Sequence, residues 1–270
     1  MKKILFTKAV ATGNDFIIVD NRLGEIGANL SAAAKKLCDR KQGIGADGLL
    51  VLESSKKCDF KMRIFNPDGS EAEMCGNGSR CIALYAAKVK IAKPDMTIEA
   101  VAGILNAGVK DDVVKVKLTD PKDIKWNFCL EIGRCPYKVS FVNTGVPHVI
   151  HFTEDLDKID VKNLGSHIRR HGEFSPDGTN ADFVKVVDKH NIKVRTYERG
   201  VEDETLACGT GAVASAIISA EVEKMPSPVT VHTQSGERIK VYFETIGGNF
   251  RNVYLEGGAK LVYEGVIDYV

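Results

Sequence analysis

The alternation of hydrophobic and polar residues divides the chain into many short segments. Several of them are rich in β-branched residues, alternate partly between apolar and polar positions, and end at Gly, Asp or Asn, a pattern typical of β-strands. We therefore predict strands at residues 15–20, 48–54, 60–66, 113–118, 183–188, 192–197 and 238–243.

Two further segments are apolar around almost the whole circumference of a helix. They are SRCIALYAAKV at residues 79–89 and AVASAIISAEV at residues 212–222. A helix on a protein surface keeps a polar face, so this pattern predicts two helices that are buried on all sides. Residues 31–40, SAAAKKLCDR, fit an outer amphipathic helix instead.

The sequence motifs occur twice, in the same order and at nearly constant spacing. ATGNDFIIVD (11–20) resembles NTGVPHVIHF (143–152), and EAEMCGNG (71–78) resembles ETLACGTG (204–211). Three more pairs agree, one of which aligns Ala46-Asp47 with Ala181-Asp182, and the five offsets lie between 132 and 135 residues. This regularity predicts a duplicated unit in which Cys75 and Cys208 occupy equivalent places.

These patterns together predict an α/β (α+β) fold. We expect two pseudo-symmetric domains, each a mostly antiparallel, β-barrel-like sheet wrapped around a central buried helix. Pro121 interrupts a strand-like run at residues 119–123, which places the boundary there. The predicted units are residues 1–120 and residues 121–257.

Charge and hydrophobicity narrow the classes of partner. With 37 basic and 36 acidic side chains, the net charge of +1 favours neither a nucleic acid nor an anionic membrane, so we expect a small-molecule partner. The longest apolar run, AVASAIISA at 212–220, has about half of the ~20 residues that a membrane span needs. The apolar run near the start is too short for a signal-peptide core, so we predict a cytoplasmic protein.

The seven cysteines fit neither a disulfide framework nor a metal site. Their number is odd, no C-x-x-C occurs, and no cysteine or histidine pair has the short spacing of structural zinc sites. We therefore expect no metal. Most of the seven are predicted to be small buried hydrophobic residues.

Cys75 and Cys208 differ from the others because each precedes Gly-x-Gly and a buried helix. The free N–H groups of a first helical turn favour an anion, and the same field stabilises a thiolate. Two such thiols, one as base and one as acid, can invert a stereocentre from opposite faces. The paired layout points to cofactor-independent racemisation or epimerisation of an α-amino acid. The alternative from another class is a thiol-redox switch that forms a reversible disulfide.

The motif NPDGSEAEMCGNGSR (66–80) resembles the signature of diaminopimelate epimerases, as do ERG (198–200) and ACGTG (207–211). The resemblance spans nearly the whole chain. It implies interconversion of LL- and meso-diaminopimelate, a step toward lysine and peptidoglycan, without a cofactor and often in a homodimer. It also implies that residues 258–270 complete the first domain.

The same resemblance assigns roles to individual residues. Cys75 and Cys208 would be the acid–base pair, and His148 and Glu198 would modulate a catalytic cysteine. Arg199 would grip the distal carboxylate, since a guanidinium can bind it with two hydrogen bonds. The remaining substrate-binding residues would be asparagines and helix-start residues: Asn14, Asn66, Gly76, Asn77, Asn180, Gly209 and Thr210, together with Glu198.

Two positions depart from the family pattern. Val146 replaces an asparagine of a G-N-P-H motif, and Gly48 replaces a glutamine, so neither position carries the side-chain amide of the family pattern. Among rivals, proline- and hydroxyproline-type racemases share the paired cysteines but usually carry histidine where Asn77 stands. Isomerases of the phenazine-biosynthesis type share the fold but lack the cysteine pair.

Overall fold

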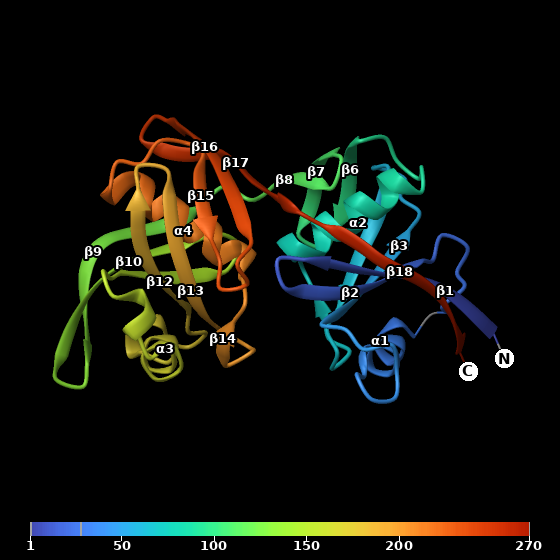
Figure 1. Ribbon diagram of the computed structural model, residues 1–270, viewed down its shortest axis with the longest axis horizontal. Coiled ribbons are helices and arrows are strands. Elements are labelled where there is room, and N and C mark those ends of the chain that lie inside the picture. The colour runs from blue at the N-terminus through green and yellow to red at the C-terminus, as the bar shows by residue number, and fades with distance from the viewer. Residues whose placement is uncertain (1, 28, 270) are drawn as a thin grey trace. The chain divides into compact units, whose positions relative to one another are not determined.

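The computed structural model describes residues 2–27 and 29–269, which divide into two compact units (Figure 1). Unit 1 comprises Met1–Lys117 and Gly257–Val270, and unit 2 comprises Leu118–Glu256. Three residues of the predicted ranges, Met1, Ala28 and Val270, lie outside the described residues. The chain leaves unit 1 once and returns to it for the last strand.

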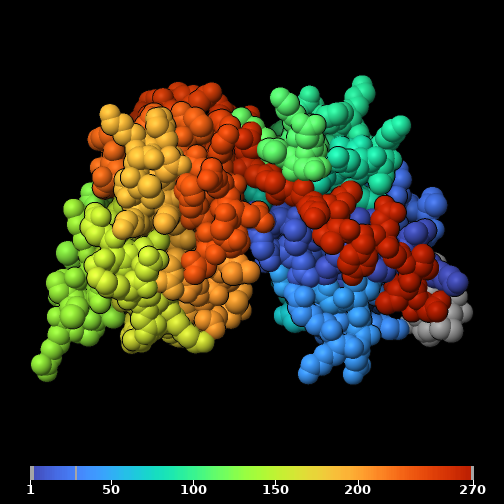
Figure 2. All heavy atoms as spheres, in the orientation of Figure 1, coloured from blue at the N-terminus to red at the C-terminus, as the bar shows by residue number. Residues whose placement is uncertain are grey.

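Unit 1 is a mixed sheet in which most neighbouring strands are antiparallel. The pairs β18–β1, β1–β2, β3–β4, β6–β7 and β7–β8 are antiparallel, whereas β2–β3 and β4–β6 are parallel. The strand β18 forms part of the exposed surface of the unit (Figure 2). The elements are β1 (Lys2–Ala11), β2 (Asn14–Asp20), α1 (Leu30–Cys38), β3 (Gly48–Glu53), β4 (Phe60–Phe65), β5 (Glu71–Ala72), α2 (Gly76–Lys88), β6 (Asp95–Ala100), β7 (Gly103–Lys110), β8 (Val113–Lys117) and β18 (Lys260–Tyr269).

Unit 2 repeats this arrangement. Strands β11 and β12 pair in parallel, as β2 and β3 do, and β13 pairs in parallel with β15, as β4 does with β6. The elements are β9 (Lys122–Ile132), β10 (Cys135–Asn143), β11 (Pro147–Phe152), η1 (Leu156–Lys158), α3 (Val161–Arg169), η2 (Gly172–Phe174), β12 (Asn180–Asp188), β13 (Asn191–Glu198), β14 (Asp203–Thr205), α4 (Gly209–Val222), β15 (Val229–His232), β16 (Arg238–Ile246) and β17 (Asn249–Gly258).

Strand register defines which residues of the two units are equivalent. Leu50 pairs with Ile64 between β3 and β4, and Asp182 pairs with Thr196 between β12 and β13. Leu50 and Asp182 therefore occupy matching places. The sequence alignment of Asp47 with Asp182 is wrong for that reason: both Ala-Asp motifs lie near a strand start, but at different positions in the register.

The two helices predicted to be buried, α2 and α4, are indeed buried against the sheets of their own units. In α2 the residues from Gly76 to Leu84 are all buried, and in α4 those from Gly211 to Ser219 are. Such mixed α/β units confirm the predicted fold class, although the sheets are not closed into barrels among the described strands. No helix in the part of the chain that the structure describes is long and apolar enough to cross a membrane.

An outer helix covers each sheet. In unit 1, α1 buries Leu30, Ala33 and Leu37 in the core, as its amphipathic pattern predicts. Its counterpart α3 is not predicted from the sequence, because Gly165 stands in the middle of the helix and weakens the helical pattern. A Cβ atom at Gly165 would lie 2.4 Å from Cβ of Tyr197, so only glycine lets α3 approach β13 this closely.

Candidate active site

In unit 1, Cys75 is the N-cap residue of α2. Its backbone is extended (φ −143°, ψ 118°), and its sulfur accepts a hydrogen bond from the Gly78 N–H at 3.4 Å. The first bond along the helix runs from Ser79 N–H to the Cys75 carbonyl. The N–H groups of Gly76 and Asn77 precede that bond, so both are available to an anion beside the thiol.

Cys208 caps α4 in the same way. Its backbone is extended (φ −118°, ψ 116°), its sulfur accepts from the Gly211 N–H at 3.4 Å, and its carbonyl accepts from Ala212. The N–H groups of Gly209 and Thr210 thus correspond to those of Gly76 and Asn77. The two predicted thiols have equivalent positions in their own units, and all seven cysteines are free thiols.

Different side chains lie beneath the two helix starts. A Cβ atom at Gly78 would lie 3.0 Å from Cδ2 of Leu50, whereas one at Gly211 would lie 2.5 Å from Oδ1 of Asp182. The glycines therefore let each helix start approach the sheet closely. The first helix meets an apolar side chain and the second meets a carboxylate.

A chain of polar contacts links that carboxylate to Cys208. Asp182 Oδ2 lies 2.7 Å from Nδ1 of His148, and both side chains are fully buried. His148 Nε2 lies 3.0 Å from Oγ1 of Thr210, which in turn lies 3.3 Å from Sγ of Cys208. The structure thus places His148 and Thr210, both predicted site residues, next to the predicted thiol.

The surroundings of Cys208 favour its protonated form. Cys208 is half-buried, and loss of solvent around its sulfur, with the negative charges of Glu198 and Asp182 nearby, raises the pKa of the thiol well above its ordinary value. Burial also raises the pKa of Glu198, which lies at the end of β13. Cys208 is therefore suited to hold a proton at neutral pH.

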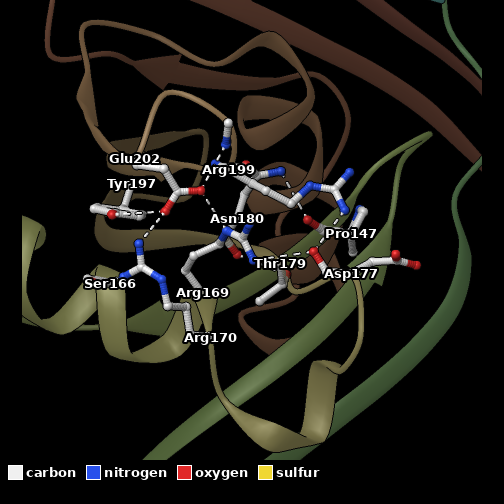
Figure 3. A network of polar contacts seen from close by, with 11 residues as sticks. Pro147, Ser166, Arg169, Arg170, Asp177, Thr179, Asn180, Tyr197, Arg199 and Glu202 are labelled. Atoms are coloured by element: carbon white, nitrogen blue, oxygen red, sulfur yellow. Dashed lines mark hydrogen bonds and ion pairs between the residues drawn. The ribbon is translucent and has the colours of Figure 1, made fainter.

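Asn180 and Arg199 belong to a neighbouring network in unit 2 (Figure 3). Asn180 Oδ1 accepts from the Arg199 backbone N–H at 2.7 Å, and its Nδ2 donates to the Pro147 carbonyl at 3.1 Å. Within the described part of the chain, the Arg199 guanidinium donates to the Asp177 carbonyl, at 3.3 Å. In residues 2–27 and 29–269, no carboxylate pairs with this guanidinium, so it can accept an anionic ligand.

The arginines on the neighbouring helix are already paired. Glu202 lies 3.0 Å from Nε of Arg169 and 2.9 Å from Nη2 of Arg170, and it also accepts from the Tyr197 hydroxyl (Figure 3). This carboxylate pairs with Arg169 and Arg170, and among the described residues it forms no ion pair with Arg199. The role of Arg199 in substrate binding stays a prediction.

A cavity of about 360 Å³ in unit 2 adjoins this guanidinium. Arg199, Asn143, Pro147 and Phe174 line it, together with Lys125, which is paired with Glu173 at 3.0 Å. The cavity combines aromatic and charged walls and is large enough for a small polar ligand. A larger cavity of about 600 Å³ in unit 1 contains none of the predicted site residues.

In unit 1 the predicted asparagines form a chain of their own. Asn77 Nδ2 donates to Asn14 Oδ1 at 2.6 Å, and Asn14 Nδ2 donates to Asp47 Oδ2 at 3.1 Å. Arg80, fully buried in α2, donates to Asn77 Oδ1 at 2.6 Å and to the Thr12 hydroxyl at 2.5 Å. Asn77 and Asn14 are thereby held in fixed orientations close to the start of α2.

Asn66 lies apart from that chain. Its side chain is exposed and donates to the Ser70 hydroxyl at 2.9 Å in the turn between β4 and β5. The turn-forming role that an unassigned asparagine would have is therefore present here. Whether Asn66 also binds substrate stays a prediction.

The two departures from the family pattern have different structural settings. At Gly48, a Cβ atom would lie 3.1 Å from the Phe65 carbonyl and 3.3 Å from the Phe16 ring, so a larger side chain would need this region to shift. Val146 is half-buried in the β10–β11 turn, where its carbonyl accepts from Thr144 N–H. Neither position supplies a side-chain amide.

Sequence reasoning missed several polar residues of these networks. Asp182, Thr196, Asp47 and Arg80 have no assigned role in the sequence analysis, although Arg80 lies inside the CGNGSR motif. For Asp182, Thr196 and Arg80 the available signal was a polar residue within an apolar strand or helix, since such residues are buried only with partners. Asp47 precedes β3 and carries no such signal. Among the described residues, no group of three or more His, Cys, Asp or Glu side chains is placed to hold a metal ion.

Comparisons with known structures agree on the fold. A phenazine-biosynthesis (PhzF family) protein from Bacillus anthracis superposes with a TM-score of 0.78 at 21% identity, covering 100% of both chains. A probable proline racemase from Agrobacterium radiobacter gives a TM-score of 0.72 at 13% identity, covering 99% of this chain and 93% of the other. At such low identity these similarities show the fold alone.

Sequence comparisons are more specific. A model of the diaminopimelate epimerase family matches residues 6–124 and 140–262. The chain is 43% identical to a diaminopimelate epimerase from Aquifex aeolicus, with 96% of each chain covered. It is 40% identical to one from Hydrogenobaculum, with 98% of this chain and 99% of the relative covered. The chain therefore belongs to the diaminopimelate epimerase family.

Proposed function

We propose that this protein interconverts LL- and meso-diaminopimelate by proton transfer between two cysteines, without a cofactor. The observation that carries the proposal is the equivalent placement of Cys75 and Cys208, each as the N-cap of a buried helix. The choice of diaminopimelate as substrate rests on relatives named diaminopimelate epimerases, which align with 96% and 98% of this chain. The cytoplasm is the compartment that we expect, and a homodimer is the expected assembly.

The reaction needs one base and one acid on opposite faces of the α-carbon. A Cys75 thiolate takes the α-proton, so the C–H bond breaks, an S–H bond forms, and its electron pair remains on the substrate as a carbanion. The Cys208 thiol then delivers its proton to the other face and becomes a thiolate. In the reverse direction the two sulfurs exchange roles, and no electrons are gained or lost overall.

The helix starts stabilise the charge that develops during this step. The N–H groups of Gly76 and Asn77, and those of Gly209 and Thr210, would donate to the carboxylate of the reacting centre. Backbone donors at a helix N-terminus cost no reorganisation when charge builds up on the bound group. The Asn14–Asn77 contact at 2.6 Å would hold the side of this cradle that unit 1 contributes.

The distal end of the substrate would bind in the cavity beside Arg199. The guanidinium has no carboxylate partner in the described residues and would pair with the distal carboxylate. Asn143 lines the same cavity, and because its Oδ1 accepts from Gly145 N–H at 3.0 Å, its amide N–H groups would be the atoms that donate to a ligand. Asn143 would thus supply the amide that Val146 lacks.

The test is an epimerisation assay with purified protein and LL-diaminopimelate. We expect wild-type protein to form the meso isomer without an added cofactor, and Cys75→Ala and Cys208→Ala each to abolish net epimerisation. Cys129→Ala, at an exposed position on β9, is the matched control and should retain activity. Proline turnover with diaminopimelate inert would favour the racemase alternative. Reversible disulfide formation without turnover of either would favour the redox switch.

A further inference from the structure

Five side chains, three from neighbouring strands and two from the start of α4, form a continuous row. Thr196 on β13 donates to Asp182 Oδ1 at 2.7 Å, and Asp182 on β12 contacts His148 on β11 at 2.7 Å. His148 continues to Thr210 at 3.0 Å, and Thr210 to Cys208 at 3.3 Å. The first three of these side chains are buried, which means that their contacts are shielded from competing water.

The donors and acceptors of this row have one consistent direction. Asn180 Oδ1 accepts from the Arg199 N–H, so the amide nitrogen of Asn180 is the atom that lies 3.4 Å from His148 Nε2. An amide nitrogen only donates, which makes Nε2 an acceptor and puts the ring hydrogen on Nδ1, facing Asp182. The Thr210 hydroxyl can then donate to Nε2 and accept from the Cys208 thiol.

Unit 1 has no titratable group at the matching positions. By strand register, Phe16 replaces His148, Leu50 replaces Asp182 and Ile64 replaces Thr196. The duplicated fold thus carries a polar row in one copy and three apolar side chains in the other. Packing alone does not call for this difference, since the apolar set fills the same space in unit 1.

We propose that Asp182 is a positioning residue that holds His148 as the proton acceptor for Cys208, through the Thr210 hydroxyl. This row of residues, the Cys208 relay, would prepare Cys208 to act as a base. The inference rests on the proposed function and adds a route by which one of the two cysteines gains or loses its proton between turnovers.

The proton transfer balances along the row. The Cys208 S–H bond breaks as its proton passes to Thr210 Oγ1, while the Thr210 hydroxyl proton passes to His148 Nε2. The products are a thiolate and an imidazolium, and the Asp182 carboxylate stabilises the imidazolium through Nδ1–H. Glu198 is the other carboxylate that faces Cys208, and it favours return of the proton to the sulfur.

The test separates the two thiols by using variants that keep only one of the two helix-capping cysteines. In deuterium oxide, the Cys75→Ala protein, which keeps Cys208, should exchange the α-hydrogen of one diaminopimelate epimer without inverting it. Adding Asp182→Asn or Thr210→Val should lower this exchange rate about a hundredfold, the lower end of what general acid–base catalysis contributes. Adding Thr210→Ser keeps the hydroxyl and should preserve the rate.

The Cys208→Ala protein is the matched control, since its exchange depends on Cys75 alone. There, Asp182→Asn should leave the exchange rate unchanged. An equal loss from Asp182→Asn in the Cys75→Ala and Cys208→Ala proteins would mean that the substitution only damages the structure of unit 2, and would overturn the proposal. Absence of exchange by the Cys75→Ala protein, while wild type is active, would overturn it as well.

A measurement without substrate keeps the relay distinct from the proposed function. Nitrogen-15 NMR of histidine-labelled protein should show His148 with its hydrogen on Nδ1, and this tautomer should lose its dominance in Asp182→Asn. An inert wild-type protein that shows this change would contradict the epimerase assignment alone. Dominance of the Nε2–H tautomer in wild type, or an unchanged tautomer in Asp182→Asn, would contradict the relay.

Discussion

At the scale of single residues, the site depends on a few close contacts that the sequence shows only in part. The helix-capping cysteines follow directly from the Cys-Gly-x-Gly pattern before an apolar run, because that pattern fixes local geometry. Asp182 is different. Its neighbours His148 and Thr196 come from other strands, so its role depends on strand register, which the sequence alignment misplaced.

The contact between Gly211 and Asp182 yields a prediction. Gly211→Ala puts a methyl group 2.5 Å from Oδ1 of Asp182, so the carboxylate or the helix start must move. We expect a loss of about 1–3 kcal/mol in the free energy of unfolding, as for other overpacked sites, with a large loss of epimerase activity. Urea unfolding and the epimerisation assay measure the two effects.

Gly78→Ala is the matched control in unit 1. Its methyl group meets the end of the Leu50 side chain at 3.0 Å, and that side chain can adjust. We expect a smaller loss of stability than for Gly211→Ala. Equal losses in the two variants would show that the buried carboxylate has no special sensitivity.

The lowered pKa of Asp15 predicts a dependence of protein stability on pH. Burial alone would raise its pKa, but hydrogen bonds and charge from Arg40 and Lys8 outweigh burial and lower the pKa to about 2. A lowered carboxyl pKa stabilises the fold above the unfolded-state pKa, about 3.9, and this stabilisation is lost as the pH falls through about 2. Asp15→Asn should therefore reduce the free energy of unfolding strongly at pH 7 and only weakly near pH 2.

Chemical denaturation of wild type and Asp15→Asn at both pH values measures this difference. Asp95→Asn, at an exposed position on β6, is the control and should change stability little at either pH. A destabilisation by Asp15→Asn that is equal at the two pH values would contradict the charge-based explanation.

At the scale of elements, hydrophobic pattern predicts the two buried helices well and the outer helices unevenly. Apolar residues around the full circumference mark α2 and α4, and the observed helices begin three residues earlier, at the glycines of each motif. The glycines have low helix propensity, but the capping cysteines and burial override it. Helix α3 is not predicted from the sequence, because Gly165 weakens its helical pattern. This glycine is needed for close packing against Tyr197, which only the structure shows.

Substitution of Gly165 tests whether close packing of α3 against β13 contributes to stability. Gly165→Ala raises helix propensity but places a methyl group 2.4 Å from Cβ of Tyr197, where the backbone or the ring must move. We expect a net loss of about 1–3 kcal/mol in the free energy of unfolding. Gly172→Ala, where a Cβ atom meets nothing within 4 Å, should be nearly neutral in the same denaturation experiment.

At the scale of the whole molecule, the duplicated sequence makes the architecture predictable. Two copies of one order of elements follow from the repeated motifs, and the strand pairings of the two units have the same pattern. What the repeat does not reveal is the chemical divergence of the copies. The same place holds Leu50 in one unit and Asp182 in the other, and single substitutions of this kind leave the repeat intact while changing the chemistry.

The divergence of the two copies fits a reaction that needs two different protonation states at once. Burial and two carboxylates raise the pKa of Cys208, which keeps that thiol protonated. The account therefore requires both cysteines for inversion, since a single thiol can exchange a proton on one face only. The homodimer stays a separate prediction, which sedimentation velocity would measure.

The most direct test is incubation of LL-diaminopimelate with the wild-type protein in deuterium oxide, followed by proton NMR and mass spectrometry of the meso product. The account predicts that each meso molecule carries deuterium at the inverted α-carbon, because the acid that delivers the new hydrogen is a solvent-exchanged thiol. Full retention of the original hydrogen in the first-formed meso product would contradict the two-cysteine mechanism.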